Sequence, residues 1–256
     1  MNLATTKAVI TGGASGLGFA CAEHIVKQGG QVTLIDINPQ AGADAVVQLG
    51  AESATFVQAD VSDEGQIQQA CDHAKQFMRS INVAINCAGV LAGGRVLGRE
   101  APMALDHFNQ AIQVNLVGSF NVAKAAANLM QHNEADADGQ RGVIINTASV
   151  AAFEGQIGQA AYSASKGGIV GMTLPMAREL TRFGIRVMTI APGVFLTPMV
   201  AGLPDDIKAA LGASVPFPSR LGEPTEFARM AEHIIENTYL NGSTIRLDGA
   251  VRLEPK

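Results

Sequence analysis

A serine, a tyrosine and a lysine stand at a spacing that could move a proton. Tyr162 and Lys166 are four positions apart, so on a helix they share one face, and Ser149 precedes the tyrosine by thirteen residues. A free tyrosine titrates near pH ~10, and a neighbouring ammonium favours the phenolate. We expect Lys166 to lower the pKa of Tyr162, and Ser149 to bind the oxygen that gains or loses the proton. The alternative is an ordinary Tyr-Lys pair on a helix surface, which is common.

Val/Ile-rich runs recur along the chain, and helical patterns separate them. The runs predict seven strands, at 7–11, 31–36, 55–60, 83–87, 143–149, 186–191 and 244–248. Amphipathic stretches predict helices at 16–28, 66–79, 103–131, 162–183 and 225–237. Strands that are apolar on both faces and alternate with helices indicate a covered parallel sheet with right-handed crossovers. We expect an α/β, doubly wound Rossmann fold with a seven-stranded parallel sheet and helices on both faces, formed by a single domain over 1–256.

Two stretches break this rhythm, and both follow strand ends. Residues 90–102 are glycine-rich, and residues 194–223 combine four prolines with many apolar side chains. In doubly wound sheets, ligands bind outside the carboxyl ends of the strands. We therefore expect both stretches to be irregular loops that wall a substrate site. The alternative is a pair of ordinary surface loops.

Composition limits the partners and the compartment. The net charge of −5 includes no run of like charges, so neither nucleic acid nor a membrane is expected as a partner. The three cysteines are widely spaced without a Cys-x-x-Cys pair, so neither a disulfide framework nor a metal site is expected. The first predicted strand begins at Lys7 and leaves no room for a signal peptide. We expect a cytoplasmic protein, or a mitochondrial one if the source is eukaryotic.

The segment between the first strand and the first helix could bind a phosphate. Residues 11–18 read TGGASGLG, and glycines there let backbone amides approach a pyrophosphate at the positive end of a helix. The spacing is looser than the G-x-G-x-x-G fingerprint, so its place between a strand and a helix is its main support. An ordinary glycine-rich turn is the alternative. The residues expected to hold a cofactor here are Gly12, Ser15, Gly16, Leu17 and Gly18.

Residues at the ends of the next strands extend this predicted site. Asp36 ends the second strand, and no Lys or Arg follows in 37–39, so its carboxylate could bind both adenosine ribose hydroxyls and repel a 2′-phosphate. This predicts NAD rather than NADP, whereas a simple strand-end cap would leave the preference open. Asp60, followed by Val61, could meet the adenine amino group. Small residues after the fourth strand would let the backbone pass close to the cofactor: Cys87, Ala88 and Gly89.

These motifs, in this order, resemble those of the short-chain dehydrogenase/reductase family over the whole chain. The matching residues are TGGASGLG at 11–18, Asp60, NCAG at 86–89, Asn115, Ser149, YSASK at 162–166, and Pro192-Gly193 with Thr197. The family pattern has Asn-Asn-Ala-Gly where this chain has Asn-Cys-Ala-Gly, a departure that disturbs no catalytic position.

The resemblance implies a role for each residue. Tyr162 would be the acid in ketone reduction and the base in alcohol oxidation, and Lys166 would also hold the nicotinamide ribose. Asn115 would hold a water that connects Lys166 to solvent, with a local helix kink as the alternative. Gln159 would reach a substrate carbonyl or face solvent. The residues expected against the nicotinamide are Pro192, Phe195 and Thr197.

The resemblance also implies an activity. The likeness fades at 90–102 and 199–213, which are parts of the expected substrate walls. It implies an NAD-dependent oxidoreductase that interconverts (S)-3-hydroxyacyl-CoA and 3-oxoacyl-CoA in fatty-acid or branched-chain acyl-CoA oxidation, with hydroxysteroids as further substrates. The alternatives are a reductase of 3-oxoacyl thioesters or acetoacetyl-CoA, and a dinucleotide-binding scaffold protein. The helical patterns at 103–131 and 162–183 resemble those that pair in family oligomers, so a homotetramer is expected.

Overall fold

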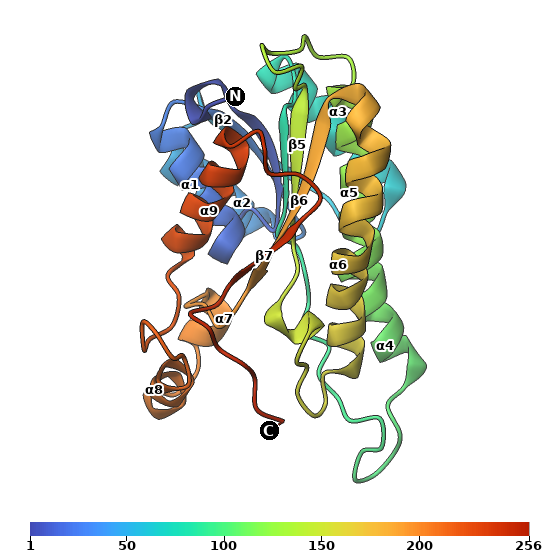
Figure 1. Ribbon diagram of the computed structural model, residues 1–256, viewed down its shortest axis with the longest axis vertical. Coiled ribbons are helices and arrows are strands. Elements are labelled where there is room, and N and C mark those ends of the chain that lie inside the picture. The colour runs from blue at the N-terminus through green and yellow to red at the C-terminus, as the bar shows by residue number, and fades with distance from the viewer. Residues whose placement is uncertain (256) are drawn as a thin grey trace.

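A central sheet with helices on both faces forms the fold of residues 1–255, which the computed structural model describes (Figure 1). The sheet has seven strands in the order β3-β2-β1-β4-β5-β6-β7. All neighbouring strands run parallel. The strands are β1 (Lys7–Thr11), β2 (Gln31–Asp36), β3 (Ala54–Gln58), β4 (Val83–Asn86), β5 (Gly142–Thr147), β6 (Ile185–Pro192) and β7 (Thr244–Leu247). The predicted doubly wound, seven-stranded parallel sheet is confirmed.

The helices form a layer on each side of the sheet (Figure 1). One layer consists of α1 (Gly16–Lys27), α2 (Pro39–Leu49) and α9 (Pro224–Glu236), and α1 packs directly against α9. The other layer consists of α3 (Glu64–Met78), α4 (Leu105–Ala111), α5 (Gly118–Met130) and α6 (Ala160–Leu180). The remaining turns and short helices are η1 (Leu3–Thr5), η2 (Ile112–Val117), η3 (Val150–Ala152), η4 (Thr181–Phe183), α7 (Pro198–Ala201) and α8 (Asp205–Ala213).

The apolar strands account for the stability of this arrangement. Every residue of β4, β5 and β6 is buried, and each face of the sheet has its own apolar cluster. Burying one large apolar side chain such as Ile10 or Phe227 stabilises the fold by about 2 kcal/mol. The sheet therefore provides a rigid edge on which side chains at the strand ends keep fixed positions.

Two helical regions differ from the sequence-based predictions. Residues 90–102 contain no helix or strand, as predicted, but the prediction that 194–223 is irregular throughout is wrong, because α7 and α8 form within it. Helix α2 was also missed, although the Asn38 side chain accepts a hydrogen bond from the amide of Ala41 and Pro39 stands at the first helical position. Both features are ordinary helix start signals.

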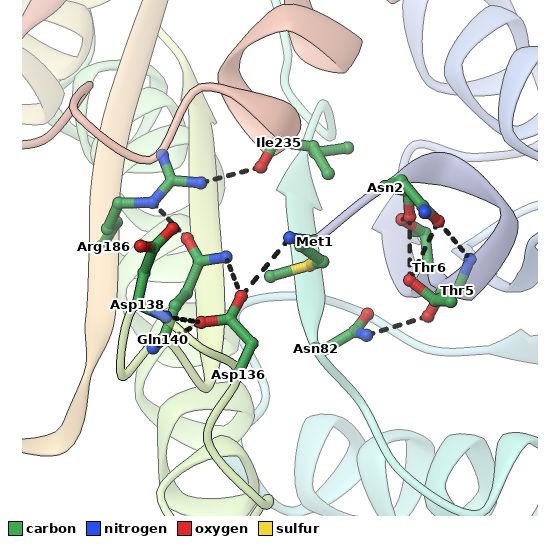
Figure 2. A network of polar contacts seen from close by, with 10 residues as sticks. All are labelled: Met1, Asn2, Thr5, Thr6, Asn82, Asp136, Asp138, Gln140, Arg186 and Ile235. Carbon is green, nitrogen blue, oxygen red and sulfur yellow. Dashed lines mark hydrogen bonds and ion pairs between the residues drawn. The ribbon is translucent and has the colours of Figure 1, made fainter.

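A polar network closes the amino edge of the sheet (Figure 2). Arg186 lies near the start of β6 with only 6% of its surface exposed. Its guanidinium donates to the side-chain oxygen of Gln140 and to the carbonyls of Ile235 and Leu240, at 2.9 and 2.8 Å. Because these carbonyls lie around the end of α9, the cation meets the negative end of that helix. Asp136 accepts from the Gln140 amide at 3.0 Å and fixes the turn that presents it.

Among the residues described, no helix combines the length and the apolar character that crossing a membrane demands.

Candidate active site

Helix α6 and the end of β5 bring the three predicted proton-transfer residues together. The Lys166 ammonium lies 5.8 Å from the centre of the Tyr162 ring and donates to the carbonyl of Thr147 at 2.7 Å. Ser149 follows β5, and its hydroxyl oxygen accepts from the Ala151 amide at 3.1 Å, which caps η3. The same hydroxyl is within hydrogen-bonding reach of the Tyr162 phenol. The three side chains therefore form one cluster at the carboxyl edge of the sheet.

Burial dominates the titration of this cluster. It raises the pKa of the Tyr162 phenol, and the hydrogen bond with Ser149 offsets part of that rise. It also lowers the pKa of the Lys166 ammonium to about 8, while the negative charge of a Cys87 thiolate would act in the opposite direction. The expected lowering of the Tyr162 pKa is therefore wrong for the chain by itself, because the loss of hydration outweighs the effect of the hydrogen bond with Ser149. At pH 7 the phenol and the ammonium both keep their protons.

Asn115 lies beside this cluster at a distortion in its helix. The predicted helix over 103–131 is interrupted by the π-helical turn η2, and Asn115 is buried at its centre. Its amide nitrogen donates to the Val90 carbonyl and the Ser165 hydroxyl, both at 3.0 Å, and its oxygen accepts from the Val90 amide at 2.8 Å. Gly89 separates it from the cation: a Cβ there would fall 3.1 Å from the Asn115 oxygen and 3.7 Å from the Lys166 nitrogen. The helix is therefore distorted at the same residue that lies beside the cluster, and π-helical turns are often found at functional sites.

The glycine loop before α1 has the shape that a dinucleotide pyrophosphate needs. Gly12 and Gly16 have φ values of +60° and +54°, which favour glycine. A Cβ at Gly12 would fall 2.9 Å from the Ala88 amide nitrogen, so the loop packs closely on the chain after β4. The side chain of Ser15, which precedes α1, makes no capping bond, so it leaves the first amides of the helix to other acceptors. The loop thus fits an anion held by backbone amides at the positive end of α1.

The two acidic residues at the strand ends differ in their surroundings. Asp36, at the end of β2, accepts from the amides of Ala14 at 3.3 Å and Asn38 at 3.2 Å, so it lies against the glycine loop. Asp60 is exposed, and one of its oxygens accepts from the amide and hydroxyl of Ser62 at 2.9 and 2.7 Å. Asp36 therefore adjoins the phosphate cradle, whereas Asp60 stabilises the start of its own turn and keeps one oxygen for another donor.

The predicted nicotinamide contacts divide into two groups. The chain after Pro192 returns to the glycine loop, because a Cβ at Gly16 would fall 3.7 Å from the Thr197 Cβ. The Phe195 ring instead packs edge-on against Phe227 in the core, with ring centres 6.4 Å apart. The Phe195 ring therefore belongs to the core, whereas the Thr197 side chain adjoins the loop.

Gln159 lies in the turn before α6. Its side-chain oxygen accepts from the Gln156 amide at 3.0 Å, and its nitrogen donates to the Gln156 side chain at 3.3 Å. The residue thus closes this turn, and its predicted contact with a substrate carbonyl stays a prediction.

Two further predicted residues are partly or wholly covered by protein. Val61 is 6% exposed, and its carbonyl accepts from the Asn121 side chain at 3.0 Å. Leu17 packs against the core cluster beneath the glycine loop.

Some residues of the site carried no recognisable sequence signal. Among the residues that the structure describes, Thr147 is the one acceptor for Lys166, and it acts through its backbone, which no side-chain pattern could reveal. Cys87, expected to be a small residue close to the cofactor, lies 3.4 Å from the Thr147 hydroxyl and also adjoins Cys21. Hydrogen bonds with Cys21 and Thr147, and the charge of Lys166, lower its pKa despite burial. Within residues 1–255, no group of three or more His, Cys, Asp or Glu could hold a metal ion.

Comparisons with known proteins cover nearly the whole chain. The family model described as short chain dehydrogenase matches residues 6–208. The 3-hydroxyacyl-CoA dehydrogenase type-2 of Bos taurus is 54% identical over 250 residues, which cover 97% of this chain and 95% of that protein. The Drosophila melanogaster protein of the same name is 49% identical, with 96% and 97% covered. The crystal structure of 3-hydroxyacyl-CoA dehydrogenase type-2 from Mycobacterium avium superposes with a TM-score of 0.92 at 38% identity, covering 97% of this chain and 96% of that one.

The comparisons and the geometry lead to the same conclusion. The close relatives are dehydrogenases, and the glycine loop fits the pyrophosphate of a nicotinamide dinucleotide. The cluster at the end of β5 provides a proton donor and acceptor beside that loop. The protein is therefore an oxidoreductase that acts on a CH–OH group with a nicotinamide dinucleotide, and it belongs to the short-chain dehydrogenase family.

Proposed function

We propose that this chain is an NAD-dependent dehydrogenase that converts (S)-3-hydroxyacyl-CoA to 3-oxoacyl-CoA. The names of its relatives support the substrate class. The observation that carries the chemistry is the cluster of Ser149, Tyr162 and Lys166 at the sheet edge. When bound, the cofactor supplies the hydride acceptor. The side chains of the protein orient the alcohol and move its proton.

Each residue of the cluster has a distinct task in this mechanism. Ser149 donates to the substrate oxygen and holds it beside Tyr162. Tyr162 accepts the hydroxyl proton during oxidation, for which it must first become a phenolate. The Lys166 ammonium favours that phenolate, and so does the Ser149 hydroxyl until it donates its single proton to the substrate oxygen instead. Asn115, which anchors α6 at Ser165, holds a water through which the proton leaves.

The proposed preference for NAD rests on Asp36. Its carboxylate lies against the glycine loop and accepts only two recorded amide hydrogen bonds, at 3.3 and 3.2 Å. The remaining capacity suits the two ribose hydroxyls of adenosine, and the negative charge repels a 2′-phosphate. Asp60, with one oxygen free of recorded partners, is assigned to the adenine amino group.

Exposed apolar side chains support an acyl substrate. Leu196, Leu203 and Ile207, in and around α7 and α8, are 37%, 38% and 45% exposed. Such side chains offer an apolar wall for an acyl chain, and a steroid would suit the same surface. We propose the acyl-CoA as the main substrate and hydroxysteroids as secondary ones.

A reductase of 3-oxoacyl thioesters is the second candidate, and one observation favours it. The raised pKa of Tyr162 keeps the phenol protonated at neutral pH, which is the form that donates a proton to a ketone. Asp36 counts against it if the reductant is NADPH. A role as a dinucleotide-binding scaffold would not require the intact cluster of Ser149, Tyr162 and Lys166, so the cluster counts against that role.

The oligomeric state and the cellular compartment of the protein are further parts of the proposal. Phe120 on α5 and Leu174 on α6 are 48% and 43% exposed, and such side chains favour pairing of these helices in a homotetramer. Three free cysteines are consistent with a reducing compartment, the cytoplasm or the mitochondrial matrix. We propose no nucleic-acid or membrane partner. Light scattering tests the tetramer.

A substrate panel tests the activity. We expect turnover of (S)-3-hydroxyacyl-CoA with NAD at a kcat/KM at least about 100-fold above that with NADP, since NADP brings a phosphate to Asp36. Tyr162→Phe removes the titratable hydroxyl and should lower kcat by about 1,000-fold, with NAD binding retained. The signal is the absorbance of the reduced nicotinamide. Full turnover by Tyr162→Phe would refute the mechanism, and turnover of hydroxysteroids alone would refute the substrate class.

A further inference from the structure

An ion-pair cluster braces the loop between β5 and α6, which carries Ser149. Arg246, on β7, donates to both oxygens of Glu154 at 2.9 and 2.7 Å. Its third nitrogen donates to Asp248 at 2.7 Å. Arg252 adds a second cation 3.2 Å from Glu154. The Glu154 and Arg246 side chains are only 22% and 23% exposed, so solvent screens this bidentate pair less than an ordinary surface pair.

The chain after β7 also holds this loop through backbone atoms. The Gln156 side chain donates to the Glu254 carbonyl at 3.0 Å, and the Ile157 amide donates to the Pro255 carbonyl at 2.9 Å. The Arg246 guanidinium lies 5.2 Å from the centre of the Phe153 ring. Consecutive loop residues are thus fastened to a strand and a tail about a hundred residues away in the sequence.

The braced segment connects directly to both proton-transfer residues. Ser149 caps η3, which ends two residues before Glu154. Beyond Glu154, Gly155 packs so closely on α6 that a Cβ there would fall 2.1 Å from the Ser163 hydroxyl, next to Tyr162. The Gln156 amide then donates to Gln159, which precedes α6. A shift of Glu154 would therefore move Ser149 and the start of α6 relative to each other.

We propose that the Glu154–Arg246 ion pair is a positioning device that holds the Ser149 hydroxyl against the Tyr162 phenol. Neither residue touches the reacting atoms. The inference rests on the proposed roles of Ser149 and Tyr162. The ion pair fixes the loop, the loop fixes Ser149, and Ser149 favours the phenolate that accepts the substrate proton.

The direction of a pH shift separates positioning from a simple charge effect. Removing the Glu154 carboxylate deletes a negative charge, which by itself would favour the phenolate and move the acid limb of kcat/KM to lower pH. Releasing Ser149 removes a hydrogen bond that favours the phenolate, and this moves the acid limb to higher pH. The other titratable groups near the phenol and its neighbours, Lys166 on α6 and Cys87 after β4, are unchanged by the substitution.

The test is Glu154→Ala in the full-length enzyme, with oxidation of (S)-3-hydroxyacyl-CoA followed from pH 6 to 10. We expect kcat/KM to fall by about 30-fold at pH 7 and the acid limb to move to higher pH, because a small displacement of a positioning group is costly. The affinity for reduced NAD, measured by its fluorescence, should stay within about twofold, since the glycine loop lies on other strands. Glu154→Gln keeps the size of the side chain and one acceptor oxygen, so its kcat/KM and its acid limb should lie between those of the wild type and of Glu154→Ala. It replaces the alanine variant in this test if that variant does not fold.

Glu226→Ala is the matched control. It removes another bidentate ion pair, to Arg220 at 2.8 and 2.9 Å, from the start of α9. It should lower the melting temperature and leave the pH profile unmoved. An unmoved profile in both Glu154 variants, or a shift to lower pH, would overturn the positioning role. Tyr162→Phe distinguishes the two failures: if it keeps full turnover, the proposed function fails as well; if it loses turnover while the Glu154 variants behave as wild type, only this inference fails.

Discussion

The two edges of the sheet each bury a cation, and they treat it differently. At the amino edge, Arg186 donates to three separate acceptors and adjoins the end of α9. Figure 2 shows two of the acceptors, Gln140 and Ile235. At the carboxyl edge, Lys166 has one recorded acceptor, the Thr147 carbonyl. Burial lowers the pKa of Arg186 to about 10 and that of Lys166 to about 8. The first cation keeps its charge under all physiological conditions, whereas the second titrates close to neutrality.

The difference shows how a single sheet serves stability and chemistry. A buried cation whose donors are paired holds the groups around it in place, and its removal would leave their acceptors without a donor. A buried cation with unused donors costs stability, and its remaining donors are available to a ligand. We therefore interpret the amino edge as structural and the carboxyl edge as functional.

Of the changes that test this comparison, replacing Lys166 with Met should have the largest effect, and that effect is on kcat/KM. The variant loses the charge that favours the Tyr162 phenolate, so kcat/KM should fall by about 1,000-fold. The melting temperature should stay level or rise, because a poorly paired buried cation has been removed. Steady-state kinetics and calorimetry measure the two effects. Activity within tenfold of wild type would show that the carboxyl edge does not depend on this cation.

Replacing Arg186 with Met should give the opposite pair of results. The side-chain oxygen of Gln140 and two backbone carbonyls would lose their donor, and the free energy of unfolding should fall by about 3 kcal/mol. The folded fraction should keep its kcat/KM within about twofold, since none of these groups lies at the carboxyl edge. Urea denaturation monitored by circular dichroism measures the loss. A large change in kcat would contradict the structural interpretation.

The sequence predicted the sheet and the grouping of the site for one physical reason. Val/Ile-rich runs mark buried parallel strands, and the carboxyl ends of such strands meet at one edge. Residues that end different strands, such as Asp36 and Ser149, must then lie along that edge. The sequence also indicated the backbone conformation of the loop before α1, because a positive φ such as that of Gly12 favours glycine.

Side-chain directions and burial could not be predicted in this way. Phe195 follows the right strand, yet its ring enters the core because Phe227 on α9 offers an apolar partner there. The pKa of Tyr162 depends on how much protein surrounds it, which spacing from Lys166 does not reveal. The Glu154–Arg246 pair joins residues 92 positions apart, beyond the reach of any local pattern.

The smallest effect is a pH dependence of stability that only the carboxyl edge should show near neutral pH. Burial lowers the pKa of Lys166 from 10.5 to about 8, so between these values the folded chain binds fewer protons than the unfolded chain. Unfolding free energy therefore rises with pH through this window, by about 2 kcal/mol from pH 7.5 to 9.5 on the Lys166 contribution. Urea denaturation across that range should show this rise in the wild type and in Arg186→Met, because the cation removed in that variant titrates at higher pH. The rise should be absent in Lys166→Met. Parallel curves for the wild type and Lys166→Met would mean that solvent or neighbouring groups already stabilise the ammonium, and the contrast between the two edges would then lie in hydrogen-bond partners alone.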